Sequence, residues 1–227
     1  MKTGVTCLYI PGWGADERSF GAVAAMCPWF SLQTVSWAAV LRGDTMPGIS
    51  SPRFLVGWSL GGLLALETAL DNPGVVAGVI VISGTARLCS AEGYAGVAAR
   101  DLRAMRTRLQ SHRAPVLADF AERCAKPDGT AQTTSDYLEQ ARQYAAEDLS
   151  LGLSAFAEKD LRTRIKDLDA PLLLIHGERD GIVPLSQAEH IAGQVPHARL
   201  EVLLNCGHAI PMTASDVVAR LITEFVA

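Results

Sequence analysis

Short apolar runs alternate along this chain with stretches of helical periodicity. The apolar runs have the length and the β-branched content of strands buried in a sheet. We expect six strands, at residues 5–10, 32–37, 54–57, 76–83, 171–176 and 199–204. Helical patterns lie at residues 16–26, 63–70, 186–195 and 214–225. Strands that alternate with helices predict an α/β fold with a mostly parallel sheet and helices on both faces.

The pattern changes in the middle of the chain. From about residue 85 to residue 166 the sequence is helical and rich in Ala and Arg, with breaks at Pro115 and at Lys126-Pro127-Asp128-Gly129 and no convincing strand. We interpret this segment as a helical cap, or lid, inserted into the core. The predicted organisation is a core of residues 1–84 and 167–227 and a cap of residues 85–166, in a single folding unit.

Composition limits the class of protein. Hydrophobic residues make up 49% of the 227 residues, charged residues make up 19%, and the formal net charge is −4. These values indicate a soluble globular protein and argue against nucleic-acid binding. The apolar runs are too short for a signal peptide or a membrane helix, so we expect a cytoplasmic protein, and a monomer. The five cysteines are odd in number and lack C-x-x-C spacing, which favours reduced thiols; we expect no metal and no cofactor.

One short motif carries the strongest chemical signal. Gly57-Trp58-Ser59-Leu60-Gly61 matches G-x-S-x-G and lies between an apolar strand pattern and an apolar helix pattern. A serine at so sharp a strand-to-helix turn projects its hydroxyl as a nucleophile, and the glycines remove side chains that would collide there. The backbone N–H of Leu60, at the start of the helix, is positioned to stabilise an oxyanion.

A nucleophilic serine needs a histidine base and a carboxylate that orients the histidine. His208 follows the last predicted strand, and Asp180 follows the strand before it. We prefer Asp180 over the neighbouring Glu178, because Gly181 and the following Ile-Val-Pro provide a sharp turn. We interpret the four other histidines as structural. The order Ser59, Asp180, His208 is that of the α/β hydrolases.

A second oxyanion donor is expected from the loop after the first strand. Gly12-Trp13-Gly14 suits this role, because the flanking glycines allow close backbone approach and Trp13 would donate its amide while its indole lines the pocket. The alternative is that Trp13 simply packs against the edge of the sheet.

With these residues in view, the chain resembles the α/β hydrolases and, more narrowly, the pimeloyl-[acyl-carrier protein] methyl ester esterases of biotin synthesis. The resemblance spans nearly the whole length and rests on four pieces: residues 12–14, residues 57–62 with Trp58, Asp160-Leu161-Arg162, and residues 180–184. Two features depart from the pattern. Pro11 replaces the histidine that commonly precedes Gly-Trp-Gly. The sequence also lacks the pattern of an N-terminal β-hairpin and has a short connection between Trp13 and Ser59.

The resemblance implies a serine carboxylesterase that cleaves a methyl ester from an acyl chain borne on acyl carrier protein, without a cofactor. Small-molecule esters are further expected substrates. The alternatives are a general short-chain carboxylesterase, a hydrolase or lyase like those of the menaquinone pathway, and a non-catalytic ligand receptor on the same fold. We expect four side chains to line the acyl channel: Trp13, Trp58, Leu117 and Phe120.

The cap also carries a local excess of positive charge. Between residues 100 and 113, five arginines stand against one aspartate, a net charge of +4 in an acidic chain. Carrier proteins are acidic, so a basic cap would steer such a partner. The five candidate carrier-binding residues are Arg100, Arg103, Arg106, Arg108 and Arg113. The alternative is a solvated helix face.

Overall fold

The computed structural model describes residues 5–44 and 53–227. The parts of the predicted core at residues 1–4 and 45–52, including much of the short connection before Ser59, lie outside the described residues. Six strands form one parallel sheet in the order β2-β1-β3-β4-β5-β6. The strands are β1 (Val5–Ile10), β2 (Phe30–Thr34), β3 (Arg53–Trp58), β4 (Val76–Ile82), β5 (Leu172–Gly177) and β6 (Ala198–Leu203).

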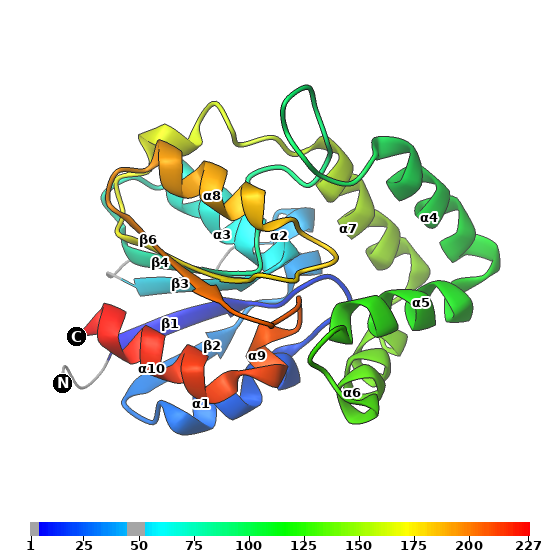
Figure 1. The fold of residues 1–227 in the computed structure, drawn as a ribbon, viewed down its shortest axis with the longest axis horizontal. Coiled ribbons are helices and arrows are strands. Elements are labelled where there is room, and N and C mark those ends of the chain that lie inside the picture. Colours follow the sequence, from blue (N-terminus) through cyan, green and yellow to red (C-terminus); the bar gives the residue numbers. More distant parts are fainter. Residues whose placement is uncertain (1–4, 45–52) are drawn as a thin grey trace.

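Helices cover both faces of this sheet, as the alternating pattern predicted (Figure 1). On one face lie α3 (Leu60–Asp71) and α8 (Leu185–Gln194), and on the other lie α1 (Gly21–Met26) and α10 (Ser215–Val226). The shorter elements are η1 (Glu17–Phe20), α2 (Trp37–Arg42), η2 (Ile165–Asp167) and α9 (Ile210–Thr213). The central strands β1, β3, β4 and β5 are almost entirely buried, so the apolar core lies on both sides of the sheet.

One predicted strand was misplaced. The expected strand at residues 32–37 begins earlier, at Phe30, and ends at Thr34, while Trp37 starts α2. Trp37 is fully buried, so its apolar side chain imitated a strand position. Gly43, at φ +78°, ends the helix in the left-handed conformation that glycine favours.

Four helices lie together beyond one end of the sheet (Figure 1): α4 (Ala99–Ser111), α5 (Arg113–Ala125), α6 (Ala131–Arg142) and α7 (Ala146–Glu158). Helix α4 packs on α5 and α7, and α5 packs on α6. Pro115 lies in the first turn of α5, where a proline costs no helical hydrogen bond, so the expected break falls at His112 instead. Between β4 and β5 the only β-pairing in the described chain is two isolated bridges. None of the described helices is long and apolar enough to cross a membrane.

Candidate active site

Ser59 occupies the turn between β3 and α3, as the motif predicted. Its backbone adopts φ +56° and ψ −115°, a strained combination for a residue with a side chain. The turn is so tight that a Cβ at Gly57 would lie 2.2 Å from the carbonyl oxygen of Gly61, and a Cβ at Gly61 would lie 1.9 Å from that of Ile10. Both glycines are therefore required by close backbone approach.

The structure brings Ser59, His208 and Asp180 into one hydrogen-bonded chain. Nε2 of His208 lies 2.9 Å from Oγ of Ser59, and Nδ1 of His208 lies 2.7 Å from Oδ2 of Asp180. An ionised carboxylate can only accept, so Nδ1 carries the proton and Nε2 accepts from the serine hydroxyl. Ser59 and His208 are 2% and 1% exposed, so the hydrogen bond between them is shielded from water.

Asp180 is held as a carboxylate by several donors. Its Oδ1 accepts from the amides of Ile182 at 2.8 Å and Val183 at 2.9 Å, the turn that the sequence predicted. Burial alone would raise its pKa, but the charge and hydrogen bond of His208, with help from His176 and the Val183 amide, outweigh burial and lower the pKa. Glu178, the competing acid, is exposed and accepts from the amide of Asn205 at 3.2 Å.

Cys206, two residues before His208, takes no part in the hydrogen bonds that join Ser59, His208 and Asp180. Burial, together with Asp128, raises the pKa of its thiol, which disfavours the thiolate form that a cysteine nucleophile needs.

The loop after β1 lies directly against the serine. A Cβ at Gly12 would lie 3.4 Å from Cβ of Ser59 and 3.0 Å from the Trp58 ring. Among the described residues, neither the Trp13 amide nor the Leu60 amide donates to a protein acceptor. The two proposed oxyanion donors are therefore free to bind a ligand oxygen.

Helix α6 and the residues that directly follow it hold this loop through three contacts that the sequence analysis missed. The Tyr137 hydroxyl donates to the carbonyl of Trp13, the Tyr144 hydroxyl donates to the carbonyl of Ala15 at 2.6 Å, and Oε1 of Gln140 accepts from the Asp16 amide at 3.0 Å. Tyr137 and Gln140 are buried. Tyr137 and Gln140 lie one turn apart on α6, but Tyr144 follows the end of the helix, so helical periodicity does not mark the three residues as one face.

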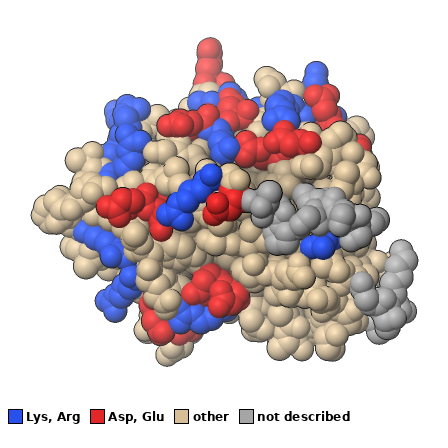
Figure 2. All heavy atoms as spheres, turned by 180° about the vertical axis from the view of Figure 1, so that it is seen from behind, with Lys and Arg blue, Asp and Glu red and all other residues tan. Residues whose placement is uncertain are grey.

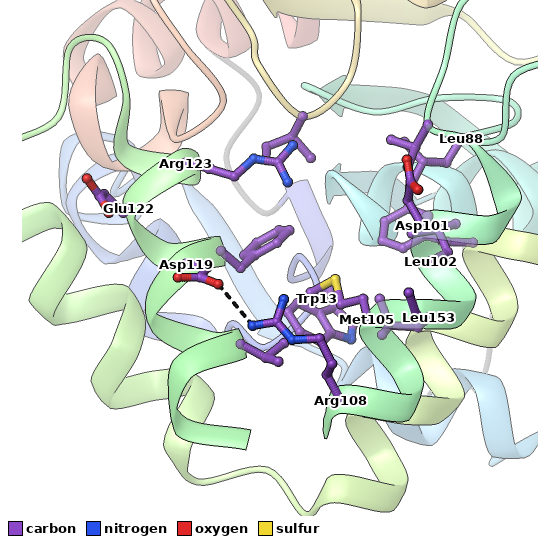
Figure 3. Close-up of a pocket in the computed structure, with 16 residues that line it drawn as sticks. Trp13, Leu88, Asp101, Leu102, Met105, Arg108, Asp119, Glu122, Arg123 and Leu153 are labelled. Atoms are coloured by element: carbon purple, nitrogen blue, oxygen red, sulfur yellow. Dashed lines mark hydrogen bonds and ion pairs between the residues drawn. The ribbon is translucent and has the colours of Figure 1, made fainter. Parts of the chain in front are cut away.

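A cavity of about 500 Å³ lies between α4, α5 and α7, next to Trp13 of the loop after β1. Figure 3 shows the side chains of Trp13, Leu102, Met105 and Leu153 directed into it. Ile182, two residues after the acid, also lines it. Most of its lining is apolar, and five charged residues stand around it: Asp101, Arg108, Asp119, Glu122 and Arg123.

Of the four side chains expected to line the acyl channel, two line this cavity and two do not. Trp13 and Phe120 line the cavity and pack edge to face, with ring centroids 4.9 Å apart. Trp58 and Leu117 are buried outside its lining. Trp58 instead supports the base, because its Nε1 donates to the carbonyl of His208 at 2.9 Å.

The five arginines between residues 100 and 113 also differ in their contacts and exposure. Arg113 is turned inward and donates to the carbonyls of Arg142 and Tyr144. Arg108 pairs with Asp119 at 3.4 Å at the cavity rim (Figure 3), and Arg106 donates to Ser154 at 2.7 Å. Arg100 and Arg103 are exposed on α4, with Arg100 lying 3.6 Å from Asp101. On the face opposite Figure 1, basic and acidic side chains are interspersed (Figure 2).

Within residues 5–44 and 53–227, no group of three or more His, Cys, Asp or Glu residues could hold a metal ion. The described site offers a serine hydroxyl, an imidazole and a carboxylate within one hydrogen-bonded chain, together with two backbone amides that donate to no described acceptor. These are the groups that acyl transfer to a serine hydroxyl requires.

A parallel sheet covered on both faces, with a serine at the strand-to-helix turn and a histidine and an aspartate on later loops, defines the class of α/β hydrolases. The chain belongs to the alpha/beta hydrolase family, which matches residues 5–221. The fold class and the hydrolase class predicted from the sequence are thus confirmed.

The chain is similar to proteins named pimeloyl-[acyl-carrier protein] methyl ester esterase. That of Aromatoleum aromaticum is 31% identical over 95% of both chains. That of Vibrio parahaemolyticus is 29% identical over 75% of this chain and 68% of its own length. Among solved structures, an esterase from Exiguobacterium antarcticum superposes with a TM-score of 0.87 at 17% identity, covering 100% of this chain and 93% of that one, which is a likeness of fold.

Proposed function

We propose that this protein is a serine carboxylesterase that hydrolyses the methyl ester of pimeloyl-[acyl-carrier protein] in biotin synthesis. The observation that carries the reaction type is the hydrogen-bonded chain from Ser59 through His208 to Asp180. The names of the similar proteins supply the substrate. The apolar cavity that Trp13 of the loop after β1 helps to line suits an acyl chain.

In the proposed reaction, Oγ of Ser59 attacks the ester carbonyl while Nε2 of His208 takes its proton. The amides of Trp13 and Leu60 stabilise the oxyanion. The intermediate expels methanol, with the proton returned from His208 to the leaving oxygen. His208 then deprotonates a water that attacks the acyl-Ser59 carbonyl, and the second intermediate releases the acid and regenerates the serine. Asp180 stabilises the imidazolium in both halves of the cycle.

We further propose that residues 85–166 form a cap over this site and that its exposed arginines contact the acidic carrier. Arg100 and Arg103 are the strongest candidates, because they are exposed and their guanidinium groups donate no hydrogen bond to a described residue. Arg113 supports the cap itself. The cap also builds the substrate cavity, since α4, α5 and α7 provide most of its lining.

The reaction type is tested with p-nitrophenyl butyrate. We expect Ser59→Ala to reduce kcat by at least about 10³-fold, the scale set by loss of a triad nucleophile. Ser83→Ala is a matched control: Ser83 is also a buried serine at positive φ, at the end of the adjacent β4, but its hydroxyl has no hydrogen-bond partner in the described chain. Unchanged turnover in Ser59→Ala would refute the triad.

The substrate is tested separately by comparing pimeloyl methyl ester on acyl carrier protein with the free methyl ester. We expect a strong preference for the carrier form, which Arg100→Glu combined with Arg103→Glu abolishes by reversing the charge on α4. Arg220→Glu, on α10, is the control. Equal rates on the two substrates would leave a general short-chain carboxylesterase as the function.

A further inference from the structure

A second, cationic hollow adjoins the apolar cavity. It measures about 260 Å³ and is lined by Arg123, Lys126, Pro127, Arg179 and Gly181. Three of these five residues are cationic, and none is acidic. The cations come from two segments distant in sequence, the end of α5 and the loop after β5, so the fold alone brings them together.

The hollow and the cavity meet at two places. Arg123 lines both, and Figure 3 shows its side chain extending from α5 over the cavity. Gly181 lines the hollow, while its neighbour Ile182 lines the cavity. The anionic group of a ligand whose apolar part lies in the cavity would therefore be close to Arg123, which the hollow shares. The same loop carries Asp180, so the hollow lies on the acid side of the proposed triad.

The cations are available to a ligand. Arg123 donates to the carbonyl of Gly181 at 3.3 Å and forms no ion pair with a described residue. Arg179 forms no ion pair within the described residues. Lys126 pairs with Glu122 at 2.8 Å, but both side chains are more than 60% exposed, and such a pair is weak and easily exchanged.

We propose that this hollow is an anion-binding subsite, separate from the oxyanion hole. It binds a phosphate or carboxylate group on a substrate whose apolar part lies in the cavity. Two guanidinium groups and an ammonium group provide the forked and single donors that such oxyanions accept. The substrate is thus amphipathic, with its anionic group outside the acyl cavity on the side of Asp180. The inference deepens the proposed esterase function and rests on it, since it assumes that the substrate's apolar part occupies the cavity.

Direct calorimetry on the intact protein tests the subsite with three probes of equal chain length: hexyl phosphate, hexanoate and 1-hexanol. We expect the tighter-binding of the two anions to have an affinity about tenfold higher than that of 1-hexanol at low salt. This difference in affinity should fall as NaCl is added. The tighter of the two anions identifies whether the group is a phosphate or a carboxylate. Equal affinity for all three probes would overturn the proposal.

Charge removal locates the effect. Lys126→Gln combined with Arg179→Gln is expected to bring the anion's advantage within about twofold of the alcohol. Arg164→Gln combined with Arg220→Gln removes the same charge from exposed positions elsewhere and is expected to retain the advantage. A preference that survives in the first pair, or is lost equally in the second, contradicts a local subsite. If the double variant misfolds, as judged by circular dichroism, Arg179→Gln alone gives the same test.

Binding and catalysis fail separately in this design. A protein that hydrolyses p-nitrophenyl butyrate but shows no anion preference keeps the esterase proposal and loses the subsite. A protein that shows the preference but no Ser59-dependent hydrolysis keeps the subsite and loses the esterase.

Discussion

The indole nitrogen of Trp58 donates a hydrogen bond of 2.9 Å to the backbone carbonyl of His208. Trp58 immediately precedes the proposed nucleophile, so one residue of β3 fixes the distance between the serine and the loop of its base. The two rings also lie close, with centroids 5.7 Å apart. Trp58 therefore contacts the loop of His208 and does not line the substrate cavity.

We predict that Trp58→Phe lowers kcat for p-nitrophenyl butyrate several-fold and lowers the free energy of unfolding by about 1–3 kcal/mol, because a buried carbonyl loses its donor. Steady-state kinetics and urea unfolding measure the two effects. Trp37→Phe is the control, since the Trp37 indole is equally buried but its nitrogen has no hydrogen-bond partner in the described chain. An equal fall in kcat in both variants would contradict a positioning role for Trp58.

Tyr137 provides a second test, on the oxyanion loop. Its hydroxyl donates to the Trp13 carbonyl, so Tyr137→Phe frees the peptide that follows the proposed oxyanion donor. We expect kcat to fall about three- to tenfold with little change in KM, because the loop binds the oxyanion mainly in the transition state. Tyr94→Phe removes a buried hydroxyl that has no partner in the described chain and should leave kcat unchanged. A change confined to KM in Tyr137→Phe would place Tyr137 in substrate binding instead.

A third prediction concerns pH. Burial lowers the pKa of His176 below its ordinary 6.5, against the opposing attraction of Asp180. The folded protein therefore keeps this imidazole neutral at a pH where the unfolded chain takes up a proton, and the free energy of unfolding falls as pH drops below 6.5. One such group contributes at most about 1.4 kcal/mol per pH unit.

Urea unfolding between about pH 7.5 and about pH 5 measures this slope. We expect the slope to be smaller in His176→Gln, whose amide can still donate to the Val183 carbonyl that His176 contacts at 2.9 Å. Asp180 does not interfere, because its lowered pKa makes its contribution fall only when pH drops below about 3.8. His112→Gln, an exposed position, should leave the slope unchanged. A slope identical in all three proteins would show that His176 does not carry the effect.

The sequence alone predicted the sheet, the strand-to-helix turn at residues 57–61 (the elbow) and the three residues of the candidate triad, because each follows from a local pattern: an apolar run, a pair of glycines, a polar residue after a strand. It missed contacts between distant segments. Nothing local to Tyr137 indicates that its hydroxyl meets the loop after β1, and nothing in Arg123 or Arg179 indicates that they share a hollow. The error at Trp37 has the same origin, since burial by distant helices made a helix residue look like part of a strand.

The geometry of the elbow leads to the last prediction. Gly57→Ala would place its Cβ 2.2 Å from the carbonyl oxygen of Gly61, a backbone atom that cannot move without displacing Ser59. We expect a loss of about 1–3 kcal/mol or more in the free energy of unfolding and a loss of kcat, because the turn must open to admit the methyl group. Gly21→Ala is the matched control: its Cβ would meet nothing within 4 Å, and its φ of −57° is helical. That change should be neutral or stabilise the protein by up to about 1 kcal/mol. Urea unfolding together with p-nitrophenyl butyrate kinetics compares the two, and a Gly57→Ala protein with normal stability and kcat would show that the close approach at the elbow is dispensable.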